Sequence, residues 1–218
     1  MLNERKTKPS IPITNRGLAI PGDLTTLLAT NFKDFLQQWS SNGAVRGFEF
    51  NHGLFPFSTE TEYAEALPSL TTKGGIHLAV AGGLDPVLGQ IGQTQPDITV
   101  LCEVNTLAEH FTHRRLAMLD RVEEGRHYWQ LIGKEFDKDR EVFRFGLPIP
   151  IDRDYRNGGW SSPEYYPIVR AAWKRGAIKL VDADITIGGI SFGLQVARAI
   201  RIPIKLIHLS NIFDYKGN

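Results

Sequence analysis

The 218-residue sequence predicts an α/β protein with a Rossmann-like, doubly wound, mostly parallel sheet and helices on both faces. Short apolar runs of strand length alternate with stretches of helical apolar spacing, the pattern of parallel sheets. The first of these runs ends in a glycine turn, and the next ends in an acid. The spacing from Gly83 to Glu103 is about 20 residues, the separation that nucleotide-binding α/β folds use.

Residues 1–42 are expected to form an N-terminal arm and a helix. Residues 1–22 are polar and contain three prolines, which favours an extended arm. Leu24–Trp39 has apolar residues at helical spacing after Asp23, a suitable N-cap. The aromatic, glycine-rich segment Gly43–Ser58 either packs over the sheet edge or forms a lid, and packing is favoured.

Residues 43–218 are expected to form one Rossmann-like domain. Its first strand is Ile76–Val80, and its second is Ile98–Cys102. Between them, Asp85 suits a helix N-cap, and a helix is expected over Pro86–Gly92, since proline is tolerated in the first turn.

The remaining elements follow from the same periodicities. Helices are expected over Thr106–Val122, Val122–Asp139, Pro163–Trp173 and Phe192–Ile200, with a strand at Ile178–Val181, a buried strand at Ile204–Leu209, and a loop at Asp152–Ser162. Gly176 is expected to end the third of these helices.

Polar residues follow each of the four expected strands: Gly82-Gly83, Glu103-Val104-Asn105, Asp182-Ala183-Asp184 and Ser210-Asn211. The carboxyl ends of parallel strands meet at one edge of a sheet, where ligands bind. The sequence therefore predicts that the four sets converge on a ligand site.

The glycine turn indicates the kind of ligand. The turn Ala81-Gly82-Gly83-Leu84 lets the backbone approach a ligand, and Glu103 can accept hydrogen bonds from ribose hydroxyls. The turn lacks the third glycine of the dinucleotide fingerprint and so lacks a pyrophosphate cradle. S-adenosylmethionine therefore fits better than NAD.

These strand ends resemble those of class I S-adenosylmethionine-dependent methyltransferases. The resemblance implies that Ala81, Gly82, Gly83 and Leu84 lie beside the methionine part of the cofactor and that Glu103 holds the ribose. It implies that Asp184, or alternatively Asp182, approaches the adenine. It also implies that Ser210 and Asn211 lie near the transferred group and act in catalysis.

A narrower resemblance is to the betaine-lipid synthase branch, which transfers a 3-amino-3-carboxypropyl group. Glu103-Val104-Asn105 is similar to its Asp-x-Asn step, with Glu in place of Asp, and so adds Asn105 to the expected cofactor-binding residues. Ser210-Asn211-Ile212-Phe213-Asp214 is similar to its Ser-Asn-Ile-x-Asp segment. The resemblance spans roughly residues 75–215.

Three functions remain open at this level. The first is transfer of a methyl or 3-amino-3-carboxypropyl group to a small-molecule or lipid-like acceptor. The second is a non-catalytic methyltransferase-like binding or regulatory domain, and the third, weakest, is a nucleotide-dependent oxidoreductase. The sequence stops shortly after the fourth strand, so truncation, completion of the sheet by another chain and a permuted order are alternatives. An open strand edge would favour a homodimer.

Composition narrows the class of protein. The net charge is +1 with acidic and basic residues interspersed, so no nucleic-acid partner is expected. The single cysteine, Cys102, lies in an apolar strand and is expected to be inert. The absence of a disulfide framework, a signal peptide and a membrane-length apolar run favours a cytoplasmic protein without a transmembrane segment.

Other conspicuous side chains are expected to be structural or solvated. His77 is expected to be structural, and His208 faces either the core or the site. A solvated helix face is expected for the following residues: His110, His113, Arg114, Arg115, Arg126 and His127. The segment Asn157-Gly158-Gly159-Trp160 is expected to be a surface turn with an anchoring aromatic, with a substrate-side tryptophan as the alternative. No metal site is expected from Asp152, Asp154 and Asp184.

Overall fold

The computed structural model describes residues 62–103, 106–136, 152–182, 185 and 190–209. The expected N-terminal arm and helix (1–42) and the segment Gly43–Ser58 lie outside this part of the chain. So do four of the predicted site residues: Asn105, Asp184, Ser210 and Asn211.

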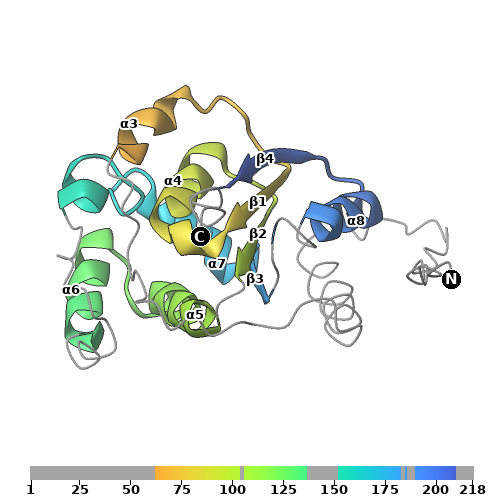
Figure 1. Cartoon of the computed structure of the whole chain (residues 1–218). Helices are drawn as coiled ribbons and strands as arrows, with labels where there is room; N and C mark the ends of the chain where they lie inside the picture. Colours follow the sequence, from red (N-terminus) through yellow and green to blue (C-terminus); the bar gives the residue numbers. More distant parts are fainter. Residues whose placement is uncertain (1–61, 104–105, 137–151, 183–184, 186–189, 210–218) are drawn as a thin grey trace, which may run out of the picture.

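Four parallel strands form the centre of the described structure (Figure 1). They are β1 (Ile76–Val80), β2 (Ile98–Glu103), β3 (Ile178–Asp182) and β4 (Ile204–His208). Their order across the sheet is β3-β2-β1-β4, and each neighbouring pair is parallel. The predicted α/β class with a parallel sheet is confirmed.

Helices connect the strands, as the apolar periodicity predicts. The described helices are α3 (Tyr63–Ala66), η2 (Leu67–Ser69), η3 (Ala81–Gly83), α4 (Leu84–Thr94), α5 (Thr106–Arg121), α6 (Gly125–Phe136), the π-helical turn η5 (Asp152–Arg156), α7 (Tyr166–Lys174) and α8 (Ile190–Ile200). α7 begins three residues later than Pro163, because residues 161–165 form turns first. Gly176 follows α7 with φ +72°, which confirms the predicted helix end.

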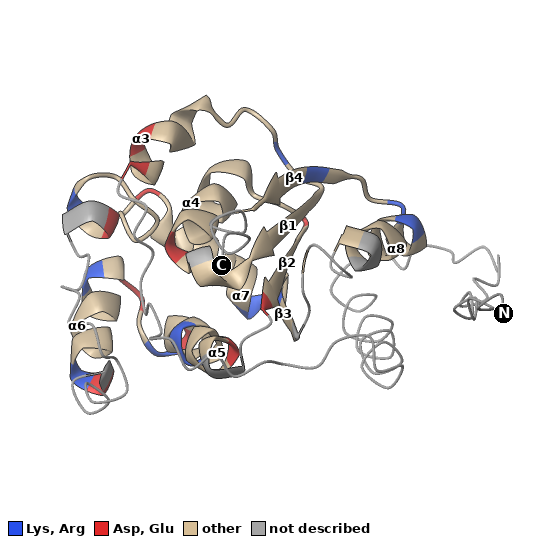
Figure 2. Ribbon diagram, viewed as in Figure 1, with Lys and Arg blue, Asp and Glu red and all other residues tan. Residues whose placement is uncertain are grey.

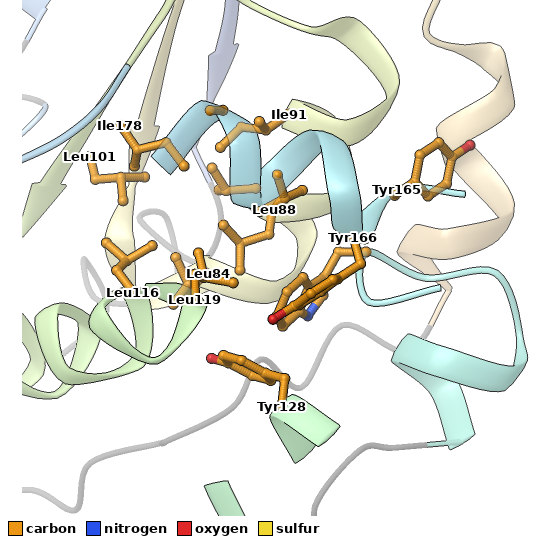
Figure 3. Packing of buried hydrophobic residues seen from close by; sticks show 14 of the residues in the cluster. Leu84, Leu88, Ile91, Leu101, Leu116, Leu119, Tyr128, Tyr165, Tyr166 and Ile178 are labelled. Atoms are coloured by element: carbon orange, nitrogen blue, oxygen red, sulfur yellow. The ribbon is translucent and has the colours of Figure 1, made fainter. Parts of the chain in front are cut away.

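One face of the sheet packs against α4, α5 and α7. Leu101 of β2 and Ile178 of β3 contribute to this apolar core, in which Leu84, Leu88 and Leu116 come from the helices (Figure 3). Packing of this kind between distant parts of the chain stabilises the parallel sheet, whose central strands are buried on both faces.

The opposite face packs against α8, which connects β3 to β4 (Figure 1). Ile76, Leu78, Val100 and Cys102 point to this second apolar cluster, to which Val196 of α8 belongs. Helices therefore cover both faces, as expected for a doubly wound fold, and the Cys102 thiol is buried as predicted.

The strand β4 corrects the sequence prediction. Ile204–Leu209 reads as a buried strand, but residues along β4 alternate between partly buried and exposed, and 43 % of Ile207 is exposed. The reason is position: within the described sheet β4 lies at the edge, so it has only β1 as a neighbour.

Candidate ligand site at the carboxyl ends of the strands

The glycine turn and Glu103 lie next to each other. β1 and β2 pair in register up to Val80 and Cys102, so the turn after β1 and the last residue of β2 reach the same edge of the sheet. A Cβ atom placed on Gly82 would lie 3.9 Å from Oε2 of Glu103. Glu103 is 7 % exposed, which leaves its carboxylate in a largely desolvated position.

The backbone of β3 extends this edge. Asp182, the last residue of β3, pairs in register with Glu103. Two acids therefore end neighbouring strands, and Asp182 is the residue that the resemblance gives as the alternative to Asp184. Asp184 lies just beyond, outside the described residues.

The strand order creates a switch point beside the glycine turn. From β1 the chain proceeds to β2 on one side, whereas β4 returns to pair with β1 on the other side. Open α/β sheets bind ligands in the crevice outside such a reversal, at the carboxyl ends of the strands. Ser210 and Asn211 follow β4 in the sequence, beyond the described part of the strand.

Within the turn, the side chains and the backbone have different roles. The side chains of Ala81 and Leu84 are buried in the core beneath the sheet edge. Gly82 is exposed, so the surface that the turn offers to a ligand is the backbone at Gly82. The turn is a 3₁₀ turn that continues directly into α4.

Asp85 does not cap α4, contrary to the sequence prediction. α4 begins at Leu84, so Asp85 lies in its first turn, and its side chain is fully buried. Nη2 of Arg115 donates to Oδ1 of Asp85 in an ion pair, and Nε1 of Trp160 donates to the same oxygen at 3.2 Å. The Asp85 carboxylate therefore accepts hydrogen bonds from residues that are distant in the sequence.

Arg115 is the residue that sequence reasoning misplaced most clearly. The sequence predicts a solvated face of α5 for it, but 2 % of its side chain is exposed. Burial alone would lower the pKa of Arg115, and the Asp85 carboxylate outweighs this effect and raises it. Its guanidinium also lies 5.8 Å from the centre of the Trp129 ring. The local sequence of α5 could not predict this ion pair, because Asp85 lies 30 residues earlier in the chain.

Trp160 is the anchoring aromatic of a surface turn, as the sequence favours, because Asn157 and Gly158 are exposed whereas Gly159 and Trp160 are buried. Its ring is fully buried and packs against Tyr128, with ring centres 4.8 Å apart at 83°. Its backbone N–H donates to the hydroxyl of Tyr63 at 3.2 Å, and that hydroxyl donates to Asp154. Trp160 therefore anchors the exposed turn at Asn157 and Gly158 to the core.

Further buried hydrogen bonds hold the same segment. Nε1 of Trp129 donates to Oγ of Ser161 at 2.7 Å, and that hydroxyl donates to the Asp154 carbonyl at 2.6 Å. Burial raises the pKa of Tyr128 to about 12, with the Arg115 guanidinium acting in the opposite sense. This network ties α3, α6 and residues 154–161 to the first turn of α4, directly behind the glycine turn.

A separate polar group lies between the sheet and α4. His77 of β1 is 1 % exposed, which confirms its structural assignment, and neither ring nitrogen has a hydrogen-bond partner among the described residues. His208 of β4 pairs in register with Ala79 on this face, and its Nδ1 lies 3.0 Å from Nε2 of Gln90. His208 therefore faces α4 and not the carboxyl edge. Burial, and then the nearby His208, lower the pKa of His77 to about 3.

The remaining predictions concern charge and metals. His110, His113 and His127 are exposed, as expected. Acidic and basic side chains are interspersed over α5 and α6 (Figure 2). Across the described residues no group of three or more His, Cys, Asp or Glu side chains could hold a metal ion. Within that same part of the chain, no helix has the length and apolar character needed to cross a membrane.

Comparison of the sequence with models of protein families gave no match, and neither did comparison with curated proteins.

Proposed function

We propose that this chain binds S-adenosylmethionine and transfers its methyl or 3-amino-3-carboxypropyl group to a small-molecule or lipid-like acceptor. The observation that supports the proposal most is the approach of the exposed Gly82 backbone to the Glu103 carboxylate. The two lie beside the central strand β1 and next to the switch point of a parallel sheet.

Glu103 suits a nucleoside. A carboxylate at the end of the second strand can accept two hydrogen bonds from vicinal ribose hydroxyls, and hydrogen bonds to ionised acceptors are strong. Asp182 ends the neighbouring strand in register with Glu103, which adds a second acid on the side where the adenine would lie.

The surroundings of α4 argue against a pyrophosphate. Helix N-termini attract phosphate when their N–H groups and positive dipole end are available. Here the first turn of α4 already contains the buried Asp85 carboxylate, which forms an ion pair with Arg115. A carboxylate beside this helix end weakens its attraction for a second anion but does not disfavour a cationic sulfonium. This favours S-adenosylmethionine over NAD.

The chemistry needs little from acid or base groups. The cofactor would supply an electrophilic carbon beside a sulfonium, and a neutral thioether would leave when the acceptor attacks. The residues of this chain then act by positioning: Gly82 and Gly83 by backbone approach, Glu103 by holding the ribose. In-line positioning and a preorganised electrostatic environment supply most of the rate enhancement in such transfers. Ser210 and Asn211, which follow β4, are proposed to lie near the acceptor.

The alternative is a non-catalytic domain that uses the same cofactor site. Both proposals predict binding, and turnover separates them. Cytoplasmic location and a homodimer through an open strand edge are likewise part of the proposal and require separate tests.

Titration calorimetry with S-adenosylmethionine, S-adenosylhomocysteine and NAD tests the site. The first two should bind and NAD should not. Glu103→Ala should abolish binding, whereas Glu164→Ala, which removes an exposed acid, should leave the affinity unchanged. Equal binding of NAD, or full binding by Glu103→Ala, would refute the proposed site.

Product identification then separates the two transfers. Incubation with S-adenosylmethionine and a panel of amine and lipid acceptors should release S-adenosylhomocysteine if a methyl group is transferred. It should release methylthioadenosine if the aminocarboxypropyl group is transferred. Binding without either product across the panel would favour the non-catalytic alternative.

A further inference from the structure

A cavity lies between α5, α7 and β3, with a volume of about 400 Å³. This is within the range of about 300–1,000 Å³ typical of small-molecule pockets. It is lined from Ile178 to Leu180 of β3, whereas the candidate ligand site lies beyond Asp182 at the other end of that strand. The four residue steps along β3 from Ile178 to Asp182 span roughly 13 Å. We refer to it as the α5–α7–β3 pocket.

The inner wall of the α5–α7–β3 pocket is apolar. Leu116 of α5 and Ile178 of β3 line it from the core, and both are buried. Leu180 adds a partly buried side chain from the same strand. An apolar wall of this kind stabilises the hydrocarbon part of a ligand by removing it from water.

Trp173 forms a fixed aromatic side of the pocket. Its Nε1 donates a hydrogen bond to Oδ2 of Asp120 at 2.9 Å. The His113 ring lies edge-on to it, with ring centres 6.4 Å apart at 87°. The indole is thus held from two directions, so binding a flat ligand would require little ordering of this side chain.

Two ammonium groups complete the lining. Lys174 lies in the last turn of α7, and Lys179 lies on β3. Gly176 connects these elements with φ +72°, and a Cβ atom there would lie 3.4 Å from Nζ of Lys179. The glycine therefore gives this ammonium room beside the chain reversal. Burial lowers the pKa of Lys179, so an approaching anion would favour its charged form.

We propose that the α5–α7–β3 pocket binds a small organic anion with an apolar body, either a carboxylate or a phosphate monoester. Its lining includes the side chains of Lys174 and Lys179 and the carboxylate of Asp120, which accepts a hydrogen bond from Trp173. The anionic group would lie between the lysines, and the apolar body would lie against the indole and the leucines. The proposal does not depend on the function proposed for the strand ends.

Nuclear magnetic resonance of the indole N–H groups tests the proposal in the full chain. The Trp173 signal would be assigned by its loss in Trp173→Phe. Benzoate and phenyl phosphate would then be titrated, with benzyl alcohol as a neutral probe of the same shape. We expect a saturable shift of the Trp173 signal with at least one anion and a much weaker response to the alcohol. A response to one anion alone would identify which headgroup the pocket prefers.

Variants locate the binding site. The double variant Lys174→Gln/Lys179→Gln should raise the Kd by at least about tenfold, since each charged hydrogen bond lost has this effect. Lys134→Gln, which changes an exposed lysine on α6, should leave it unchanged. Lys174→Glu gives a second test if the double variant folds poorly. The proposal would be overturned by the absence of a saturable shift up to roughly 10 mM, by equal affinity for the alcohol, or by unchanged affinity in the lysine variants.

Discussion

The buried His77 makes a quantitative prediction about pH and stability. Its ring is 1 % exposed, and neither nitrogen has a hydrogen-bond partner among the described residues. Its pKa falls from 6.5 to about 3 in the folded state, chiefly through burial. The folded protein therefore holds His77 neutral at acidities that protonate it in the unfolded chain.

The sign and size of the effect follow from proton linkage. Above pH 6.5 both states are neutral, and His77 has no effect on the pH dependence of stability. As the pH falls from 6.5 toward 3, the unfolded state takes up a proton that the folded state cannot, so stability is lost. At about pH 4 the loss amounts to about 3 kcal/mol, a large share of the roughly 5–15 kcal/mol that stabilise a domain.

Urea unfolding at a series of pH values, for the wild-type protein and His77→Leu, measures this contribution. Leucine has a similar volume to histidine and does not titrate. Because the substitution removes two buried nitrogens, the variant should be at least as stable as the wild-type protein near pH 7. Below pH 6.5 the free energies of unfolding should diverge, with the variant more stable by about 3 kcal/mol at about pH 4. His110→Gln, at an exposed position, is the matched control and should follow the wild type.

The difference between the curves is the decisive quantity, because carboxylates titrate equally in both proteins. A constant difference between about pH 7 and pH 4 would refute the reasoning, since it would mean that His77 titrates alike in the folded and unfolded chains. A variant that loses stability more steeply than the wild type would refute it as well.

Two further predictions concern packing behind the glycine turn. Gly125→Ala should destabilise the protein by about 3 kcal/mol or more, because its Cβ would lie 1.8 Å from the Ser161 carbonyl oxygen. Gly158→Ala should cost only about 1–2 kcal/mol of backbone strain, because φ is +76° there and no atom of the described residues beyond its chain neighbours lies within 4 Å of the added Cβ. Thermal unfolding measures both, and equal costs would contradict the close approach of Gly125 to Ser161. Arg115→Met should cost about 3–5 kcal/mol by leaving the Asp85 carboxylate buried without its counter-ion. Adding Asp85→Asn should recover part of that loss in chemical unfolding, and strictly additive losses would show that the two residues are not coupled.

Periodicity was sufficient to predict the sheet and most of its connections. Apolar runs located all four strands, and helical spacing located α5 and α8 within a few residues. These elements are predictable because each one buries side chains at a regular spacing along its own sequence. The juxtaposition of Gly82 and Glu103 was likewise predictable, since parallel strands bring their carboxyl ends together.

The errors share one physical cause, which is contact between distant segments. Asp85 looked like a helix cap and Arg115 like a solvated residue, because each lacks its partner in the local sequence. Similarly, the apolar content of β4 predicts a buried strand, and only the strand order reveals an edge. Local patterns contain no information on these pairings.

The position of β1 has a consequence for biosynthesis. This strand lies inside the sheet and precedes the glycine turn, yet one of its two neighbours is β4, which pairs Ile204 with Ile76. A ribosome adds roughly 5–20 residues per second, so roughly 10 s pass between the synthesis of the two strands. During this interval the β4-facing edge of β1 has no native partner, and exposed strand edges recruit other chains. A nascent chain of this protein should therefore depend on chaperone occupancy most strongly before β4 leaves the ribosome tunnel, and slow codons placed between α8 and β4 should lower its soluble yield.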